Sequence, residues 1–112
     1  MRSPRSITSA EDFRAAYRRG RRARVDGVTV YARSVPGDEA RLGLVVRAGT
    51  GGAVARNRLR RRLRAIYRAH GPRPGYDVVV RTDPSAPLNY QELERTVTRA
   101  FVGAGLGRLE PG

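Results

Sequence analysis

The stretch that most restricts how this chain can fold is residues 53–70, which contain seven arginines and no acidic residue. The arginines are Arg56, Arg58, Arg60, Arg61, Arg62, Arg64 and Arg68. A helix with about 3.6 residues per turn gathers the apolar residues of this stretch on one narrow stripe. That stripe consists of Ala55, Leu59, Leu63 and Ile66, and the opposite face of Asn57, Arg60, Arg61, Arg64 and Arg68. We therefore expect an amphipathic helix that packs on a core and presents arginine outward.

The arginines of this helix repel one another, because several are spaced four residues apart. Like charges at this spacing lie close together on a helix surface and destabilise it. The pairs are Arg56 with Arg60, Arg60 with Arg64, and Arg64 with Arg68. A polyanion bound along the outer face would relieve this repulsion, so the pattern indicates a nucleic-acid-binding helix.

The whole chain is strongly basic, with a formal net charge of +13 over 112 residues. All 23 basic residues are arginine, whose planar fork binds phosphate through two hydrogen bonds and stacks on bases. A GC-rich genome would explain the choice of arginine over lysine, but not the net charge. A hydrophobic content of 39% supports a folded protein, and the length fits a single domain over residues 1–112. Residues 1–7 and 103–112 are expected to be flexible ends.

Other classes of protein fit poorly. The apolar runs are too short to span a bilayer, and the basic N-terminus lacks the apolar region of a signal peptide. The chain has no cysteine, which excludes disulfides and thiolate metal sites. We expect a cytoplasmic protein with no membrane partner and no small-molecule substrate.

The first half of the chain reads as a helix followed by strands. A capping-box pattern over residues 8–11 opens a helix that Gly20 would close. Residues 21–24 are expected to be a basic loop. Residues 25–35 form a strand, or two short strands, with alternation of apolar and polar residues. A second strand over 41–47 is expected to pair with it as a hairpin.

The second half adds a strand and a helix after the arginine-rich helix. Residues 76–81 form the strand, and Asn89 caps a last helix with a stapling pair, Leu88 and Leu93. Its buried stripe is expected to be Leu93, Val97, Ala100, Phe101 and Ala104, and glycines 103, 105 and 107 to fray its end. The order predicts an α+β fold, a compact single-domain sandwich with helices on a three- or four-stranded sheet.

No catalytic residues are predicted in this chain. Its acids stand mostly at helix starts and turns, and His70, its one histidine, stands at a helix end. Neither a carboxylate pair for metal chemistry nor a Ser/His/Asp set is apparent, so we predict no metal site. The glycine loop over residues 49–52 precedes a helix, where it would serve either as a phosphate site or as a hinge.

Three aromatic residues allow two interpretations. Phe13, Tyr17 and Tyr31 are either core residues or the lining of a groove in which unpaired bases stack. Tyr31 shares a strand face with Arg33. An aromatic ring beside a cation suits single-stranded nucleic acid better than a dry core.

The sequence Arg56-Asn57-Arg58, followed by Leu59-Arg60-Arg61 and Arg64, resembles the RNR signature of the bacterial ribonuclease P protein component. The resemblance extends over roughly residues 8–102. Glu11-Asp12-Phe13, Tyr17 and Gly20 resemble the first helix of that family, and residues 41–46 its strand before the signature. Residues 76–81 and 90–101 resemble its last strand and last helix.

The resemblance implies a ribosomal-S5-domain-2-like fold in which the arginine-rich helix lies in a left-handed βαβ crossover. It also implies a subunit of ribonuclease P, the ribonucleoprotein endonuclease that removes the 5′ leader from precursor tRNA. In that family the catalytic RNA performs the hydrolysis with Mg²⁺ that is bound mainly by RNA. The implied partners are therefore the catalytic RNA and precursor tRNA.

Two sets of site residues follow from the resemblance. The residues expected to contact the catalytic RNA are Arg56, Asn57, Arg58, Arg60, Arg61, Arg64 and Arg68. Those expected to line a cleft for the single-stranded leader are Phe13, Tyr17, Tyr31, Arg33 and Arg47. Arg47 stands where the family has two lysines, and Arg62 where it has an apolar residue; the Arg62 side chain is expected to lie along the surface with its head in water.

Two alternatives remain at this point. The first is a structural RNA-binding protein of the ribosomal type, which would share the fold but lack a leader cleft. The second is a DNA-binding protein that uses residues 53–70 as a recognition helix, against which stands the lack of a second helix directly after Gly71.

Overall fold

A five-stranded mixed sheet forms the centre of the molecule. The structure is a computed structural model, and it describes residues 4–47, 49 and 51–106. The sheet order is β1-β4-β5-β3-β2. The strands are β1 (Arg5–Ser6), β2 (Arg21–Val25), β3 (Val28–Ser34), β4 (Ala40–Val46) and β5 (Tyr76–Thr82).

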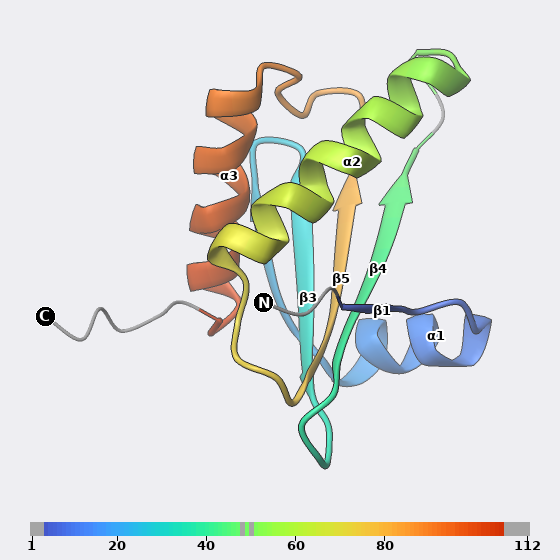
Figure 1. Cartoon of the computed structure of the whole chain (residues 1–112), viewed down its shortest axis with the longest axis vertical. Helices are drawn as coiled ribbons and strands as arrows, with labels where there is room; N and C mark the ends of the chain where they lie inside the picture. The colour runs from blue at the N-terminus through green and yellow to red at the C-terminus, as the bar shows by residue number, and fades with distance from the viewer. Residues whose placement is uncertain (1–3, 48, 50, 107–112) are drawn as a thin grey trace, which may run out of the picture.

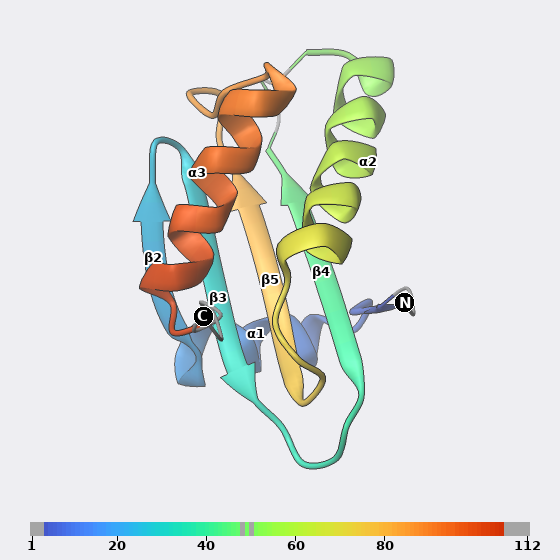
Figure 2. The same ribbon diagram turned by 60° about the vertical axis from the view of Figure 1, so that its left-hand side comes forward.

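Three helices cover the two faces of this sheet. They are α1 (Ala10–Arg19), α2 (Ala53–His70) and α3 (Tyr90–Gly103). Helices α2 and α3 lie side by side on one face, and α1 lies across the other (Figures 1 and 2). The result is the predicted α+β sandwich, and α2 has the bounds that the sequence predicts. The sheet has five strands and not the expected three or four, because residues 5–6 and 21–25 also pair into it.

The arginine-rich helix α2 connects two parallel neighbours in the sheet, β4 and β5. In Figure 1 both strands run upward behind α2, and β5 lies to the left of β4. This crossover is therefore left-handed, whereas most βαβ connections are right-handed. The handedness implied by the family resemblance is confirmed.

Strand alternation decides which residues form the main core. Val28, Val30 and Ala32 of β3 are all buried beneath α2 and α3, as their spacing predicts. The predicted stripe of α3 is also buried, from Leu93 to Ala104. The stripe of α2 differs at one end, because Ala55 is exposed and Tyr67 is buried in its place. The sheet ends before it reaches the first turn of α2, so Ala55 has nothing to pack on.

Two strand predictions were wrong. The expected basic loop over residues 21–24 belongs to strand β2, which pairs with β3 through a tight turn at Asp26 and Gly27. Both turn residues have positive φ, as the Asp-Gly turn of a two-residue hairpin requires. The expected hairpin between β3 and β4 does not form, because β5 lies between them.

The ends of the helices also differ from prediction. Ser9, and not Thr8, is the N-cap of α1; its Oγ accepts hydrogen bonds from the backbone N–H groups of Glu11 and Asp12. The end of α3 is closed by a Schellman motif and does not fray. Leu106 donates to the carbonyl of Phe101, and Gly105 adopts a φ of 81°. Gly107 lies outside the described residues.

Residues at both of the expected flexible ends belong to the fold. Residues 5 and 6 pair with β4, and Ile7 is buried against α1. At the other end, α3 runs through Gly103 and Leu106 is buried. Residues 1–3 and 107–112 lie outside the described part of the chain.

Candidate RNA-binding surfaces

The outer face of α2 is a row of free arginines. Arg58, Arg61, Arg64 and Arg68 are exposed, and within the described part of the chain no residue hydrogen-bonds or ion-pairs with them. No acidic residue in α2 offsets their charge. This surface therefore attracts phosphate along the length of the helix. We call it the α2 surface.

Other polar side chains of α2 have partners within the protein. Arg56 donates from Nη1 to the carbonyl of Gly51 at 2.7 Å, where the helix has no side-chain cap. Arg60 donates to Oδ1 of Asn57 at 3.1 Å. Since two of the predicted contacts are engaged in this way, Arg60 and Arg56 present fewer free donors to RNA than the other predicted arginines.

The guanidinium of Arg62 does not lie free in water as expected. Its side chain is half-buried, and Nη1 donates to the backbone carbonyl of Leu88 at 2.5 Å. This hydrogen bond ties α2 to the segment that leads into α3. The hydrogen bond gives the buried part of the side chain a polar partner, and this explains how the helix tolerates a charge at the edge of its buried stripe. An apolar residue at this position would pack there without making the hydrogen bond.

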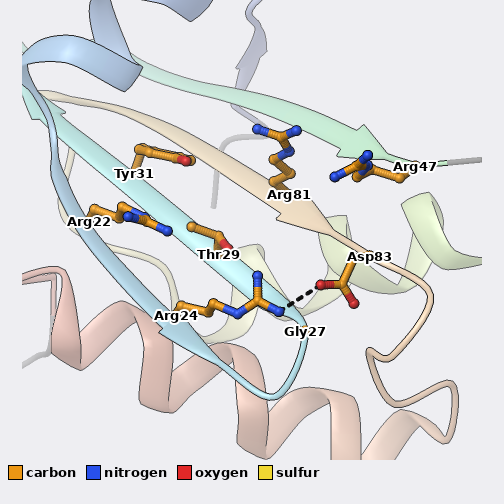
Figure 3. Close-up of a pocket in the computed structure, with 8 residues that line it drawn as sticks. All are labelled: Arg22, Arg24, Gly27, Thr29, Tyr31, Arg47, Arg81 and Asp83. Atoms are coloured by element: carbon orange, nitrogen blue, oxygen red, sulfur yellow. Dashed lines mark hydrogen bonds and ion pairs between the residues drawn. The ribbon is translucent and has the colours of Figure 1, made fainter.

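A cleft opens on the other face of the sheet, next to α1. It has a volume of about 180 Å³. We call it the sheet cleft; its lining residues, shown in Figure 3, are Arg22, Arg24, Gly27, Thr29, Tyr31, Arg47, Arg81 and Asp83. They come from four strands or from segments directly after them. Four of the eight are arginines, so the cleft is strongly basic.

Sheet register brings these residues together. Arg24, Thr29 and Arg81 occupy consecutive positions across β2, β3 and β5, and Arg22 pairs with Tyr31 in the next row. Residues paired in this way point to the same face of a sheet. The same alternation that buries Val28 and Val30 under α2 and α3 therefore builds the cleft on the opposite face.

The aromatic residues form a short cluster of edge-on and tilted rings that extends from α1 to Tyr31 in the cleft. The ring centroids of Tyr17 and Tyr31 lie 4.7 Å apart, and those of Phe13 and Tyr17 lie 6.3 Å apart. The guanidinium of Arg81 lies 6.0 Å from the Tyr17 ring centroid. Tyr31 is 9% exposed, so its ring is both part of the core under α1 and part of the cleft lining.

Phe13 packs on the sheet at Gly43 and does not line the cleft. A Cβ at position 43 would meet its ring at 2.7 Å, so only glycine leaves room for this contact. Of the predicted leader residues, only Tyr31 and Arg47 line the cleft; Tyr17 does not line it but contacts the Tyr31 ring. Phe13 contacts the Tyr17 ring and not the cleft itself.

Arg33 lies elsewhere. It lines a second depression on the other side of α1, with a volume of about 430 Å³. We call this the α1 hollow; it is lined by Glu11, Asp12, Arg14, Ala15, Arg18, Arg19 and Arg33. Arg33 and Tyr31 share a strand face, as predicted. However, α1 lies across this face and separates the α1 hollow, which contains Arg33, from the sheet cleft, which contains Tyr31.

A clamp of charged residues holds α1 on the sheet. Arg41 of β4 binds the fully buried Asp77 of β5 through two hydrogen bonds, Nη2–Oδ2 at 2.6 Å and Nε–Oδ1 at 2.8 Å. It also reaches Asp12 of α1 at 3.2 Å. The hydrogen bond to Asp77 is the main cause that raises the pKa of Arg41, so the guanidinium remains charged. The clamp therefore joins α1 to β4 and β5.

Asp83 is the one acid among the described residues that line the sheet cleft. Hydrogen bonds from the Ser85 hydroxyl and backbone N–H lower the pKa of Asp83, and Arg24 lowers it further. Its Oδ2 accepts from Nη2 of Arg24 at 2.8 Å (Figure 3). Asp83 therefore neutralises and orients one of the four cleft arginines.

The acidic residues and His70 of the described chain do not cluster around a common point. No three His, Asp or Glu side chains there group to hold a metal ion. His70 pairs with Glu94 at 2.8 Å, near the C-terminal end of α2. No described helix is both long and apolar enough to cross a membrane. The predicted phosphate site at residues 49–52 stays untested, since Thr50 lies outside the described residues.

Sequence reasoning missed most of the cleft lining. Arg22 and Arg24 were placed in a loop, and Arg81, Thr29 and Asp83 were not singled out. The one available signal was the Asp-Gly turn at residues 26–27, which predicts the β2–β3 hairpin and with it the alternation of Arg22 and Arg24.

Comparison with known proteins identifies the family of this chain. The family model described as Ribonuclease P matches residues 1–105. The ribonuclease P protein component of Beutenbergia cavernae is 41% identical over 101 residues, covering 87% of this chain and 85% of that protein. The solved RNase P protein of Thermotoga maritima superposes with a TM-score of 0.69 at 29% identity, covering 94% of this chain and 97% of that one.

The fold is shared even where the sequence has diverged. The RNase P protein of Staphylococcus aureus has 22% identity and a TM-score of 0.79, with 92% of this chain and 97% of that chain covered. Strands flank α2 on both sides, so the structure lacks the helix pair in which a DNA-binding recognition helix is usually held. This chain belongs to the ribonuclease P protein component family, whose members are RNA-binding subunits of the endoribonuclease that processes the 5′ ends of tRNA.

Proposed function

We propose that the α2 surface binds the catalytic RNA of ribonuclease P and that the sheet cleft binds the single-stranded 5′ leader of precursor tRNA. Hydrolysis of the phosphodiester bond takes place in the RNA subunit, with Mg²⁺ bound mainly by RNA. The protein works in the cytoplasm, where precursor tRNA is processed. The observation that carries the proposal is the placement of two different basic surfaces on opposite faces of one sheet.

The α2 surface suits a folded RNA. Its four free arginines lie along a helix of 18 residues, with no acid and no exposed aromatic ring among them. Such a surface binds phosphate groups and recognises the shape of the RNA backbone, without specificity for particular bases. A large RNA whose backbone passes along the helix would also relieve the repulsion between the arginines.

The sheet cleft suits a single strand. It is a small depression of about 180 Å³ on an open face of the sheet, and it combines an aromatic residue with four arginines. Tyr31 offers a ring on which a base can stack, and Arg22, Arg81 and Arg47 surround it with positive charge. Stacking and charge together bind single-stranded RNA with little sequence preference, as a subunit that handles many different leaders requires.

The experiment that tests this function is cleavage of a leader-bearing precursor tRNA by a bacterial ribonuclease P RNA at low Mg²⁺, with and without the protein. We expect the protein to stimulate cleavage at the mature 5′ end, because its arginines replace part of the charge screening that Mg²⁺ otherwise supplies.

Binding separates this function from that of a structural RNA-binding protein. With the RNA subunit present, precursor tRNA with a leader should bind more tightly than mature tRNA. Equal binding of the two tRNAs, with no stimulation of cleavage by a cognate RNA, would contradict the proposed function.

A further inference from the structure

The α1 hollow is a second basic surface on the cleft side of the sheet, and the proposed function leaves it without a role. It contains four arginines: Arg14, Arg18, Arg19 and Arg33. Across the described ranges, none of these guanidinium groups has a hydrogen-bond or ion-pair partner. Of the two acids in the hollow, Asp12 is engaged by Arg41 at 3.2 Å. Only Glu11 is left to offset four clustered positive charges, so the hollow favours an anion.

The crest of α1 joins this hollow to the sheet cleft. Ala16 faces the sheet and is fully buried. Arg14 and Arg18 lie two residues away from it on either side, which on a helix turns them roughly 160° away from the sheet, and both are exposed. Tyr17 flanks Ala16 on the side of the cleft, where its ring packs edge-on against Tyr31. A basic path therefore runs from the sheet cleft, over α1, into the hollow.

The two ends of this path differ in chemistry. The sheet cleft contains Tyr31, whereas no aromatic residue lines the α1 hollow. Bases have no ring to stack on in the hollow, so contacts there would go to phosphates and would not depend on sequence. A strand that has already entered the cleft would reach the hollow by continuing across the helix crest.

We infer that the crest of α1 and the α1 hollow bind phosphates of the same single-stranded leader, nearer to its 5′ end than the segment in the sheet cleft. This inference rests on the proposed function. It predicts that the protein binds longer leaders more tightly than short ones. The gain comes from Arg14, Arg18, Arg19 and Arg33 and does not depend on leader sequence.

The test compares two leader lengths on the reconstituted holoenzyme. Precursor tRNAs would carry leaders of about 4 and about 16 nucleotides, the limits of the site size of many single-strand-binding folds. The variant is Arg14→Ala with Arg18→Ala. The readout is the holoenzyme concentration that gives half-maximal single-turnover cleavage, measured over a range of salt concentrations.

The matched control is Arg95→Ala with Arg99→Ala. These two arginines are also exposed, unpaired within the described structure and four residues apart on a helix, but α3 lies on the opposite face of the sheet. The control removes the same charge from the protein. Any loss that it shares with the α1 variant is therefore an effect of net charge.

For the α1 variant we expect weaker binding of the long leader alone. Its salt slope should fall by about 0.7 for each phosphate that the protein no longer binds, or by about 1.4 for two phosphates. The short leader and the control variant should change less than twofold. An equal loss for both leader lengths, an equal loss in the control, or no loss at all would each overturn the inference.

Failure of this inference can be told apart from failure of the proposed function. If the parent protein binds leader-bearing and mature tRNA equally, the proposed function fails first. The parent protein could instead prefer leader-bearing tRNA while its binding does not depend on leader length, or while that dependence survives the loss of Arg14 and Arg18. In that case the sheet cleft keeps its proposed role and only the inference about α1 is wrong.

Discussion

The α2 surface and the sheet cleft are both basic, but they are built in different ways. The arginines of the α2 surface come from one continuous helix, and they lack both an acid and an aromatic neighbour. The sheet cleft draws its residues from β2, β3, β5 and the segments after β4 and β5, and it combines arginines with Tyr31 and Asp83. A local surface can only offer repeated charge, whereas a surface assembled by sheet register can place a ring, a cation and an anion side by side.

This difference predicts two kinds of binding. The α2 surface should respond to salt and to the number of phosphates, with little regard for the kind of RNA. The sheet cleft should respond to the presence of an unpaired strand. Variants that separate these responses test the comparison directly.

The largest effect is expected from Arg61→Ala, Arg64→Ala and Arg68→Ala in combination. Removing three phosphate-binding side chains should lower the salt slope of RNA binding by about 2 to 3 log-log units and weaken binding roughly 100-fold near 0.1 M salt. The measurement is a salt titration of binding to the catalytic RNA. An unchanged slope would mean that α2 does not face RNA. The Arg95→Ala, Arg99→Ala control removes two charges and this variant removes three, so the two are compared as the loss in binding per charge removed.

A smaller effect is expected from Tyr31→Ala. Loss of base stacking should cost about 1–3 kcal/mol in the binding of leader-bearing precursor tRNA and should leave mature tRNA unaffected. Tyr31→Phe keeps the ring and should bind nearly as well as the parent. Because Tyr31 also packs under α1, thermal unfolding must be measured on both variants. An equal loss for mature tRNA would indicate a folding defect and not a stacking site.

The smallest effect, and one of opposite sign, is expected from Asp83→Asn. It removes the acid from the cleft and frees Arg24, so leader binding near pH 7 should tighten slightly, with a salt slope steeper by up to about 0.7. The control is Glu94→Gln, which also replaces a carboxylate by an amide. Glu94 pairs with His70 outside the cleft, so this variant should bind the leader as the parent does. Weaker leader binding by Asp83→Asn would show that the orientation of Arg24 matters more than its charge.

The pH dependence of stability offers a second measurement on Asp83. Its pKa is lower in the folded protein than the ordinary value of 3.8, so its charged form stabilises the fold at any pH above that value. This contribution declines only as the pH falls below 3.8 and through the lowered pKa. The free energies of unfolding of the parent and Asp83→Asn should therefore differ by a constant amount near neutral pH and converge under acid conditions.

The sequence alone determined those features that depend on local periodicity and on short motifs. The spacing of Leu59, Leu63 and Ile66 predicted α2 with its observed bounds, and the RNR signature pointed to the family that the comparisons then showed. Alternation in residues 28–33 predicted which side chains of β3 share the face that packs under α2 and α3. These patterns are visible in sequence because neighbouring side chains on one element share an environment.

Only the tertiary structure decided the order of the strands and the composition of the cleft. The chain gives no local sign that β5 inserts between β3 and β4, yet this insertion places Arg81 beside Thr29 and separates Arg33 from Arg47. The position of α1 likewise depends on Arg41 and Asp77, which are 36 residues apart. Pairing between strands distant in sequence depends on how the whole core packs. That packing depends on contacts between distant segments, so no single segment predicts it.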